Sequence, residues 1–252
     1  MRPAVDDYAR RAPSLAAFLT FRRGSLDWEN ASQTRVHVSG STVPSWICFF
    51  GREGLVDAAR RLAEIGEMQR GWLAGSVGDQ AYADEAFGEI RELAPAVVDA
   101  LLDRWVAAEL RPMIGDAARA LVGERARSGD MLILASASCE LLARACAREL
   151  GIELFVGGIP EVSCDGLYTG RQIGPHAFGR GKLERVDLLL GAMGLSRLGF
   201  DEMRAYSDSA HDLPLLRAAT LPFAVDPEPE LMEIATQESW PVLRLAPSAF
   251  GG

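Results

Sequence analysis

The chain has 252 residues, of which 48% are hydrophobic and 24% charged, and its formal net charge is −9. This composition is typical of a globular protein with a sizeable core, and the acidic balance argues against nucleic acid or anionic membranes as partners. No apolar run approaches the ~20 residues of a membrane-spanning helix, and the start lacks a signal peptide's apolar stretch, so a cytoplasmic protein is expected.

The first half of the chain divides into an atypical start and a helical stretch. Residues 15–21 form an apolar run that suits a buried strand. Residues 19–50 lack the helical amphipathicity that the following segment shows. From residue 52 to 111 apolar positions recur at helical spacing, as in GLVDAARRLAEIGEM, and we expect a helical bundle without strands there.

After residue 112 helices and short apolar strands alternate. The predicted strands are MLILA, LFVGG, MRAYS and PFAVD, and EVSCDGLYTGRQI is typical of a hairpin that turns at Asp165-Gly166. This alternation predicts an α/β fold with a doubly wound parallel sheet. Ligands of such sheets bind beyond the carboxyl ends of the strands.

Three polar features fall at those strand ends. Ser136 follows MLILA and precedes a helix, where a hydroxyl can face an anion, although a serine there is more often a helix cap. Lys182 opens a helix after FGRG and is the only lysine among 26 basic residues. Asp208 comes at the end of the strand MRAYS, directly after Ser207, and Asp212 lies four residues on. Two such carboxylates can hold Mg²⁺, while helix capping explains the same spacing equally well.

The order of these features resembles the haloacid dehalogenase (HAD) superfamily, in its phosphoserine-phosphatase-like branch, subfamily IB. A hydroxyl after one strand, a lysine before the next helix and Asp-Ser-x-x-Asp after a third strand are similar to motifs II, III and IV of these phosphatases. The resemblance covers roughly residues 93–245 and includes the connectors LRPMIGDAARAL and DGLYTGRQIGPHAFGRGK. It implies a HAD-like Rossmannoid core from residues 1–30 and 112–252, with a helical cap inserted at 31–111.

The resemblance also implies a chemistry. In the family an aspartate attacks phosphorus, and water hydrolyses the aspartyl phosphate. Asp208 and Asp212 would hold Mg²⁺, Lys182 would neutralise the nucleophile and the phosphoryl oxygens, and Ser136 would donate a hydrogen bond to the phosphoryl group. We therefore expect a Mg²⁺-dependent phosphatase acting on a small phosphomonoester. The alternative is a catalytically inactive HAD-fold module that retains the phosphate and metal contacts.

The first family motif, Asp-x-Asp-Gly-Thr after a buried strand, is missing. In the best positional match, LAAFLTFRRGSL, Phe21 occupies the nucleophile position and Arg23 the acid position, and neither can act there. Two weaker matches supply carboxylates: Asp27 with Glu29, and Asp6 with Asp7. An altered reading frame around residues 19–50 or a natural loss of catalysis would each explain the missing motif.

The remaining metal-binding residue types give no further site. The four cysteines show no C-x-x-C spacing, so neither a zinc site nor a disulfide framework is predicted. His37, His176 and His211 have no partner at metal-ligand spacing, and we expect them on the surface or in loops. Neither the substrate nor the oligomeric state follows from the sequence.

Overall fold

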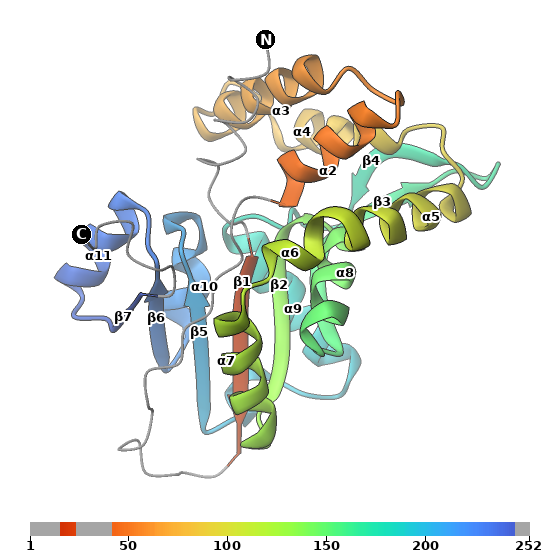
Figure 1. Cartoon of the computed structure of the whole chain (residues 1–252). Coiled ribbons are helices and arrows are strands. Elements are labelled where there is room, and N and C mark those ends of the chain that lie inside the picture. The colour runs from red at the N-terminus through yellow and green to blue at the C-terminus, as the bar shows by residue number, and fades with distance from the viewer. Residues whose placement is uncertain (1–15, 24–41, 245–252) are drawn as a thin grey trace, which may run out of the picture.

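The computed structural model describes residues 16–23 and 42–244 (Figure 1). Seven strands form one sheet: β1 (Ala16–Arg22), β2 (Met131–Cys139), β3 (Leu154–Val162), β4 (Tyr168–Ile173), β5 (Glu202–Ser207), β6 (Leu221–Val225) and β7 (Val242–Leu243).

The helices of the described residues fall into two groups. Those between β1 and β2 are α2 (Thr42–Arg52), α3 (Ala58–Leu73), α4 (Asp79–Glu85), the 3-10 turn η2 (Gly88–Ile90), α5 (Pro95–Trp105), the π-helical η3 (Val106–Leu110), α6 (Arg111–Met113) and α7 (Asp116–Arg127). Those after β2 are α8 (Glu140–Leu150), α9 (Arg180–Ala192), the 3-10 turns η4 (Arg197–Gly199) and η5 (Ala210–Asp212), α10 (Leu213–Ala218) and α11 (Pro229–Gln237). No helix in this part of the chain is both long and apolar enough to span a membrane.

The strand order is β4-β3-β2-β1-β5-β6-β7. Strand β3 is parallel to β2, and β6 and β7 are parallel to β5. Because β2 and β5 are both antiparallel to β1, they run in the same direction as each other. Five strands therefore share one direction, and β4 opposes them as the second strand of the predicted hairpin. The prediction of a mostly parallel α/β sheet is confirmed.

The central strand β1 runs against its neighbours, so the prediction of an early strand parallel to them is wrong. Ala16 pairs with Ser136 at the carboxyl end of β2, and Phe21 pairs with Met131 at its amino end. The charges that follow the apolar run explain this direction. Arg22 reaches the buried Asp130 before β2, with Nε 2.7 Å from Oδ1, and Arg23 lies over the ring of Phe200.

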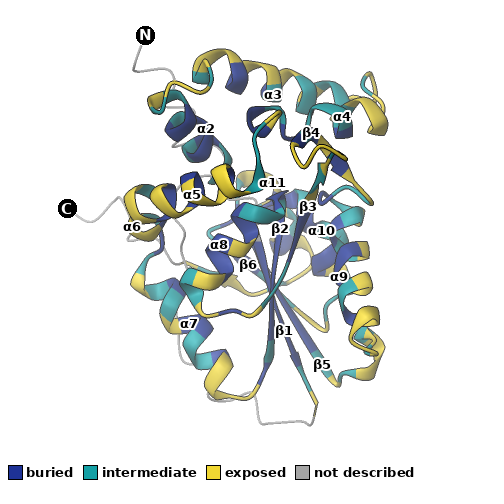
Figure 2. Ribbon diagram, turned by 90° about the vertical axis from the view of Figure 1, so that its right-hand side faces the viewer, coloured by how far each residue is buried: buried dark blue, intermediate teal, exposed yellow. Residues whose placement is uncertain are grey.

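Both faces of the sheet are covered, which makes three layers. Leu19 and Phe21 of β1 belong to a core that α9, α10 and α11 complete, whereas Phe18 points into the core on the side of α7 and α8. Figure 2 shows the sheet as a buried band with α7 and α8 on one side and α9 and α10 on the other. This sandwich leaves the two ends of the sheet for other contacts.

Helices α2, α3 and α4 lie beyond the end of the sheet at which the parallel strands finish (Figure 1). The hairpin β3–β4 extends toward them and contacts α4 and η2. Helix α2 corrects the expectation that residues before 51 lack an amphipathic helix. Trp46 and Phe50 are buried and pack together, and the indole of Trp46 meets Trp105 of α5 edge-on at 5.6 Å. Burial against a distant helix therefore stabilises α2.

The direction of β1 can be tested through Arg22. Breaking a buried ion pair from one side costs about 3–5 kcal/mol, and we expect Arg22→Met to lower the free energy of unfolding by the lower end of that range, because Arg125 also lies 3.8 Å from Asp130. Urea unfolding measures this. The control Arg23→Met removes an exposed cation–π contact and should cost less than about 1 kcal/mol. Equal, small losses in both variants would contradict an antiparallel β1.

Candidate functional site

The four predicted site residues lie at the carboxyl ends of β2 and β5. Asp208 directly follows β5, Lys182 is the third residue of α9, and Asp212 ends η5. Ser136 was expected just after its strand, but β2 continues to Cys139 with an irregular register against β3, so Ser136 lies within the strand. The side chains of Ser136, Lys182 and Asp212 are almost fully buried.

The strand register sets the distance across this site. Ser136 pairs with Ala16 on one side of β1, and Phe18 pairs with Tyr206 on the other, two residues before Asp208. Since neighbouring strands lie about 4.8 Å apart, the main chains at Ser136 and Asp208 are separated by roughly 10 Å. This spacing brings both residues within reach of one small ligand.

Lys182 and Asp212 form a buried ion pair. The ammonium nitrogen lies 2.5 Å from Oδ1 of Asp212, and each side chain is only 2% exposed. The other carboxylate oxygen, Oδ2, accepts a hydrogen bond of 2.7 Å from the hydroxyl of Ser207. Both oxygens of Asp212 are thus engaged, which fixes this side chain and leaves it a supporting rather than a direct role toward a cation.

Asp208 has a different environment. Its Oδ1 is buried and has no hydrogen-bond partner within the described residues. Burial, and after it the negative charge of Asp212, raise the pKa of this carboxyl group to about 8. A desolvated carboxylate beside a second acid is stabilised by a cation, so Asp208 fits the direct ligand of a hard metal ion.

Ser136 is held by a second serine. Its Oγ lies 2.7 Å from Oγ of Ser138 and also accepts a hydrogen bond from the Ser138 amide at 3.2 Å. Ser138 and Ser207 are not among the residues predicted from the sequence, although Ser138 lies two residues after Ser136 and Ser207 lies directly before Asp208 and five residues before Asp212. Each of these neighbours orients a predicted site residue.

Glycines position the lysine. A side chain at Gly181 would place its Cβ 1.9 Å from the carbonyl oxygen of His176, and Gly179 has a φ of +54°. Only glycine allows the chain to pass this close and turn in this way. Steric constraints therefore explain the two glycines of FGRG. They allow α9 to pack against the preceding loop and direct Lys182 inward.

His176 and His211 do not lie isolated on the surface. They belong to a cluster of five rings, hereafter the ring cluster, formed by Trp72, Tyr82, His176, Phe178 and His211. Trp72 of α3 meets Phe178 edge-on at 5.2 Å, and Phe178 packs on His211 at 4.5 Å. The ring cluster connects α3 and α4 to the loop before α9, which carries Lys182, and to η5, which carries Asp212.

The residues that match the missing nucleophile motif by position, Phe21 and Arg23, do not lie near the candidate site. Because β1 is reversed, Phe21 and Arg23 lie at the amino ends of β2 and β5, at the opposite edge of the sheet from Ser136. The weaker matches, at Asp6 and Asp7 and at Asp27 and Glu29, fall outside the described residues.

Asp208 fits a direct ligand of Mg²⁺, and Asp212 fits a supporting residue beside it. The buried, unpartnered oxygen of Asp208 is the observation that favours a cation there, and carboxylate oxygens are the ligands that Mg²⁺ prefers. Residues 16–23 and 42–244 contain no group of three or more His, Cys, Asp or Glu residues that could hold a metal ion. Mg²⁺ bound here would keep several water ligands.

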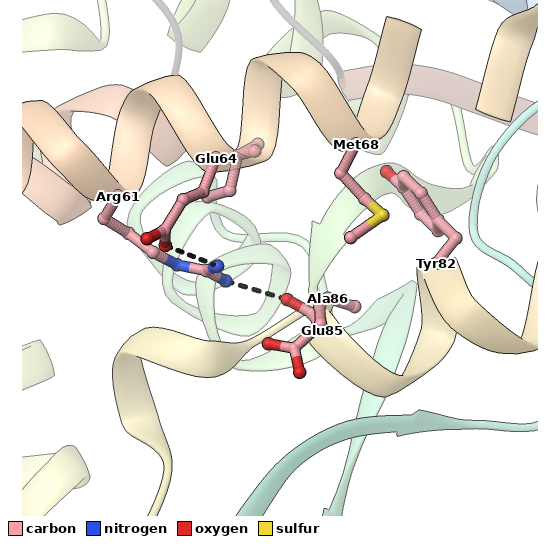
Figure 3. A pocket seen from close by; sticks show the side chains of 7 residues that line it. Arg61, Glu64, Met68, Tyr82, Glu85 and Ala86 are labelled. Atoms are coloured by element: carbon pink, nitrogen blue, oxygen red, sulfur yellow. Dashed lines mark hydrogen bonds and ion pairs between the residues drawn. The ribbon is translucent and has the colours of Figure 1, made fainter. Parts of the chain in front are cut away.

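A separate cavity of about 300 Å³ opens between α3 and α4 (Figure 3), and none of the four site residues lines it. The Arg61 guanidinium donates to the carbonyl oxygen of Glu85 at 2.8 Å and pairs with Glu64 and with the buried Glu89. Its charge is therefore engaged in holding the two helices together.

The fold and this edge define the class of protein: a three-layer α/β protein with a lysine, a hydroxyl and an acidic pair at the carboxyl ends of its strands. The family model of haloacid dehalogenase-like hydrolases matches residues 38–217. The chain belongs to this family. The match includes all four predicted site residues and begins after β1.

Similar proteins and solved structures are consistent with this family assignment. A histidinol-phosphatase of Neisseria meningitidis is 29% identical over 199 residues, which cover 79% of this chain and 90% of that protein. A solved protein of unknown function from Bordetella pertussis is 31% identical with a TM-score of 0.73, covering 80% of this chain and 91% of that one. A probable phosphoserine phosphatase from Vibrio cholerae, 16% identical with a TM-score of 0.55, covers 81% and 57% respectively and shares the fold.

The raised pKa of Asp208 predicts how stability depends on pH. Between its ordinary value of about 4 and about 8 the folded protein binds a proton at Asp208 that the unfolded chain does not, so this group makes stability fall as pH rises through that window. Asp208→Asn removes the effect. In thermal melts with EDTA we expect the variant to match the wild type near pH 4 and to melt higher at pH 8–9. The control Glu230→Gln, at an exposed position, should follow the wild type throughout; an Asp208→Asn curve that does the same would contradict the assignment.

Proposed function

We propose that the protein is a HAD-type phosphatase that hydrolyses a small phosphomonoester with Mg²⁺. The observation that carries the proposal is the convergence of a buried lysine, a buried serine and a desolvated carboxylate at one edge of the sheet. A phosphate ester is a dianion that such a set can hold and polarise. Histidinol phosphate and phosphoserine are the first substrates to test, because the similar proteins include a histidinol-phosphatase and a probable phosphoserine phosphatase.

The residues would divide the work by their charge. Lys182 holds a positive charge inside the protein, where low polarity strengthens its attraction for phosphoryl oxygens, and Asp212 fixes its position. Ser136 donates its hydroxyl proton to a phosphoryl oxygen once it turns from Ser138. Mg²⁺ bound to Asp208 would neutralise charge on the phosphate and on an attacking carboxylate.

We also propose that residues 31–111 act as a cap over a core made of residues 1–30 and 112–252. The helices of this stretch stand beyond the carboxyl ends of the strands (Figure 1). The ring cluster supports the division, since Trp72 and Tyr82 of α3 and α4 reach the loop before α9. Helices placed there can cover a substrate bound at the ends of the strands.

A second candidate function is an inactive HAD-fold module that binds phosphate esters without cleaving them. One observation favours it: β1, the strand that carries the nucleophile in the family, contains no carboxylate and is reversed. Without an attacking carboxylate no aspartyl phosphate forms, however well Lys182 and Asp208 are placed. The two functions therefore share a binding site and differ in a single chemical group.

Turnover and binding separate the two functions. With p-nitrophenyl phosphate and Mg²⁺ we expect slow hydrolysis, with orthovanadate binding detected by calorimetry. Lys182→Ala should reduce both, and the rate by about 100-fold or more, as when one charge-stabilising donor is lost. Lys182→Arg should not restore the rate, because the planar fork does not fit the place of a compact ammonium. Vanadate binding without hydrolysis would favour the inactive module, and neither binding nor hydrolysis would overturn both functions.

The source of an attacking carboxylate can be found by substitution. We expect Asp27→Asn or the pair Asp6→Asn and Asp7→Asn to abolish the slow hydrolysis while vanadate still binds, since loss of a nucleophile removes chemistry and not binding. The double variant Phe21→Asp, Arg23→Asp is the contrast: with β1 reversed it places carboxylates at the wrong edge and should not raise the rate. A large increase in rate would show that β1 runs parallel to its neighbours.

A further inference from the structure

We infer that Glu228 is a positioning residue for the candidate metal site, an inference that rests on the proposed function. Glu228 lies in the loop after β6, where α11 begins, and contacts the turn that carries Asp208 and Asp212. In this role Glu228 fixes the main-chain conformation of the turn, and with it the direction of the Asp208 carboxylate.

Three hydrogen bonds join Glu228 to this turn. Its Oε1 accepts from the backbone amide of Ala210 at 2.7 Å and from the hydroxyl of Ser209 at 3.2 Å. Its own backbone amide donates to the carbonyl oxygen of Asp208 at 2.9 Å. Glu228 thus bonds to Asp208, Ser209 and Ala210 in succession, which are the two residues between β5 and η5 and the first residue of η5.

The Glu228 side chain does not stabilise the start of its own helix. Glu228 is the N-cap residue of α11, yet its side chain makes no capping bond to α11. The carboxylate instead caps the first turn of η5, where Ser209 in turn accepts from the His211 amide. Glu228 thus stabilises the turn at residues 208–210 and not the end of α11. We take this as support for a role of Glu228 in fixing that turn.

The two ends of the turn are then fixed independently. At Asp212 the buried Lys182 and the hydroxyl of Ser207 hold the side chain, and at Asp208 the contacts with Glu228 hold the main chain. The Asp208 side chain is left with a buried, unpartnered Oδ1 among the described residues. Glu228 itself has its Oε1 committed to Ala210 and Ser209 and acts through the turn.

The test compares Glu228→Ala, Glu228→Gln and the control Glu230→Ala, which changes an exposed glutamate of α11. Loss of an outer partner of a metal ligand typically weakens metal binding by about 10-fold or more, and we expect Glu228→Ala to do so for Mg²⁺ in calorimetry. Glu228→Gln keeps the accepting oxygen and should bind Mg²⁺ within about threefold of the wild type. Glu230→Ala should bind like the wild type.

Hydrogen exchange gives a readout that does not need the metal. The Ala210 amide should be protected in the wild type and in Glu228→Gln and exchange rapidly in Glu228→Ala, with the amides of β5 unchanged. If Glu228→Ala proves too unstable, Glu228→Asp replaces it, because its carboxylate is one methylene too short to reach the Ala210 amide without a shift of the main chain.

The outcomes separate the two proposals. Wild-type Mg²⁺ affinity in Glu228→Ala, or in Glu228→Asp where that replaces it, would overturn the positioning role and leave the proposed function intact. Absence of Mg²⁺ binding in the wild type would overturn the metal site and the positioning role together. Weakened binding in Glu228→Gln equal to that in Glu228→Ala would also overturn the role as stated, because the accepting oxygen would then not be what matters.

Discussion

The buried pair of Lys182 and Asp212 is the constraint on which the site depends. Two opposite charges, each 2% exposed, join the start of α9 to the end of η5. Removing either partner alone would leave an uncompensated charge inside the protein, which is far more costly than losing the pair as a whole. Three features position the elements that carry this pair. They are the glycines before Lys182, the Ser207 hydroxyl bonded to Asp212, and the ring cluster.

A consequence of this constraint is that the two acids of the site differ. Asp212 has one oxygen paired with the Lys182 ammonium and the other bonded to Ser207, while Oδ1 of Asp208 is buried with neither a hydrogen-bond donor nor an ion-pair partner among the described residues. Two carboxylates four residues apart thus have distinct physical states: one maintains the structure of the loops and the other is available to a ligand. The spacing alone, which helix capping explains equally well, does not reveal this difference.

The sequence predicts those parts of the molecule that depend on neighbouring residues in the chain. Strands β2, β5 and β6 are short apolar runs between helices, and the position of Asp208 follows from where β5 ends. The direction of β1 could not be predicted, because residues 15–21 are apolar on both faces and the partner of Arg22, Asp130, lies 108 residues away. Helix α2, Ser138 and the role of Glu228 likewise depend on tertiary contacts that leave no periodic pattern.

The central place of β1 has a consequence for how the chain folds. Strand β1 pairs with β2, more than 100 residues later in the chain, and with β5, later still. Until both exist, it has two unpaired edges and two apolar faces, which is the condition that favours association with other chains. Closing such distant pairings is slow because the entropy of the long intervening loops is lost first. The two pairings of β1 are therefore slow to form, and until they form, residues 16–22 are open to association with other chains.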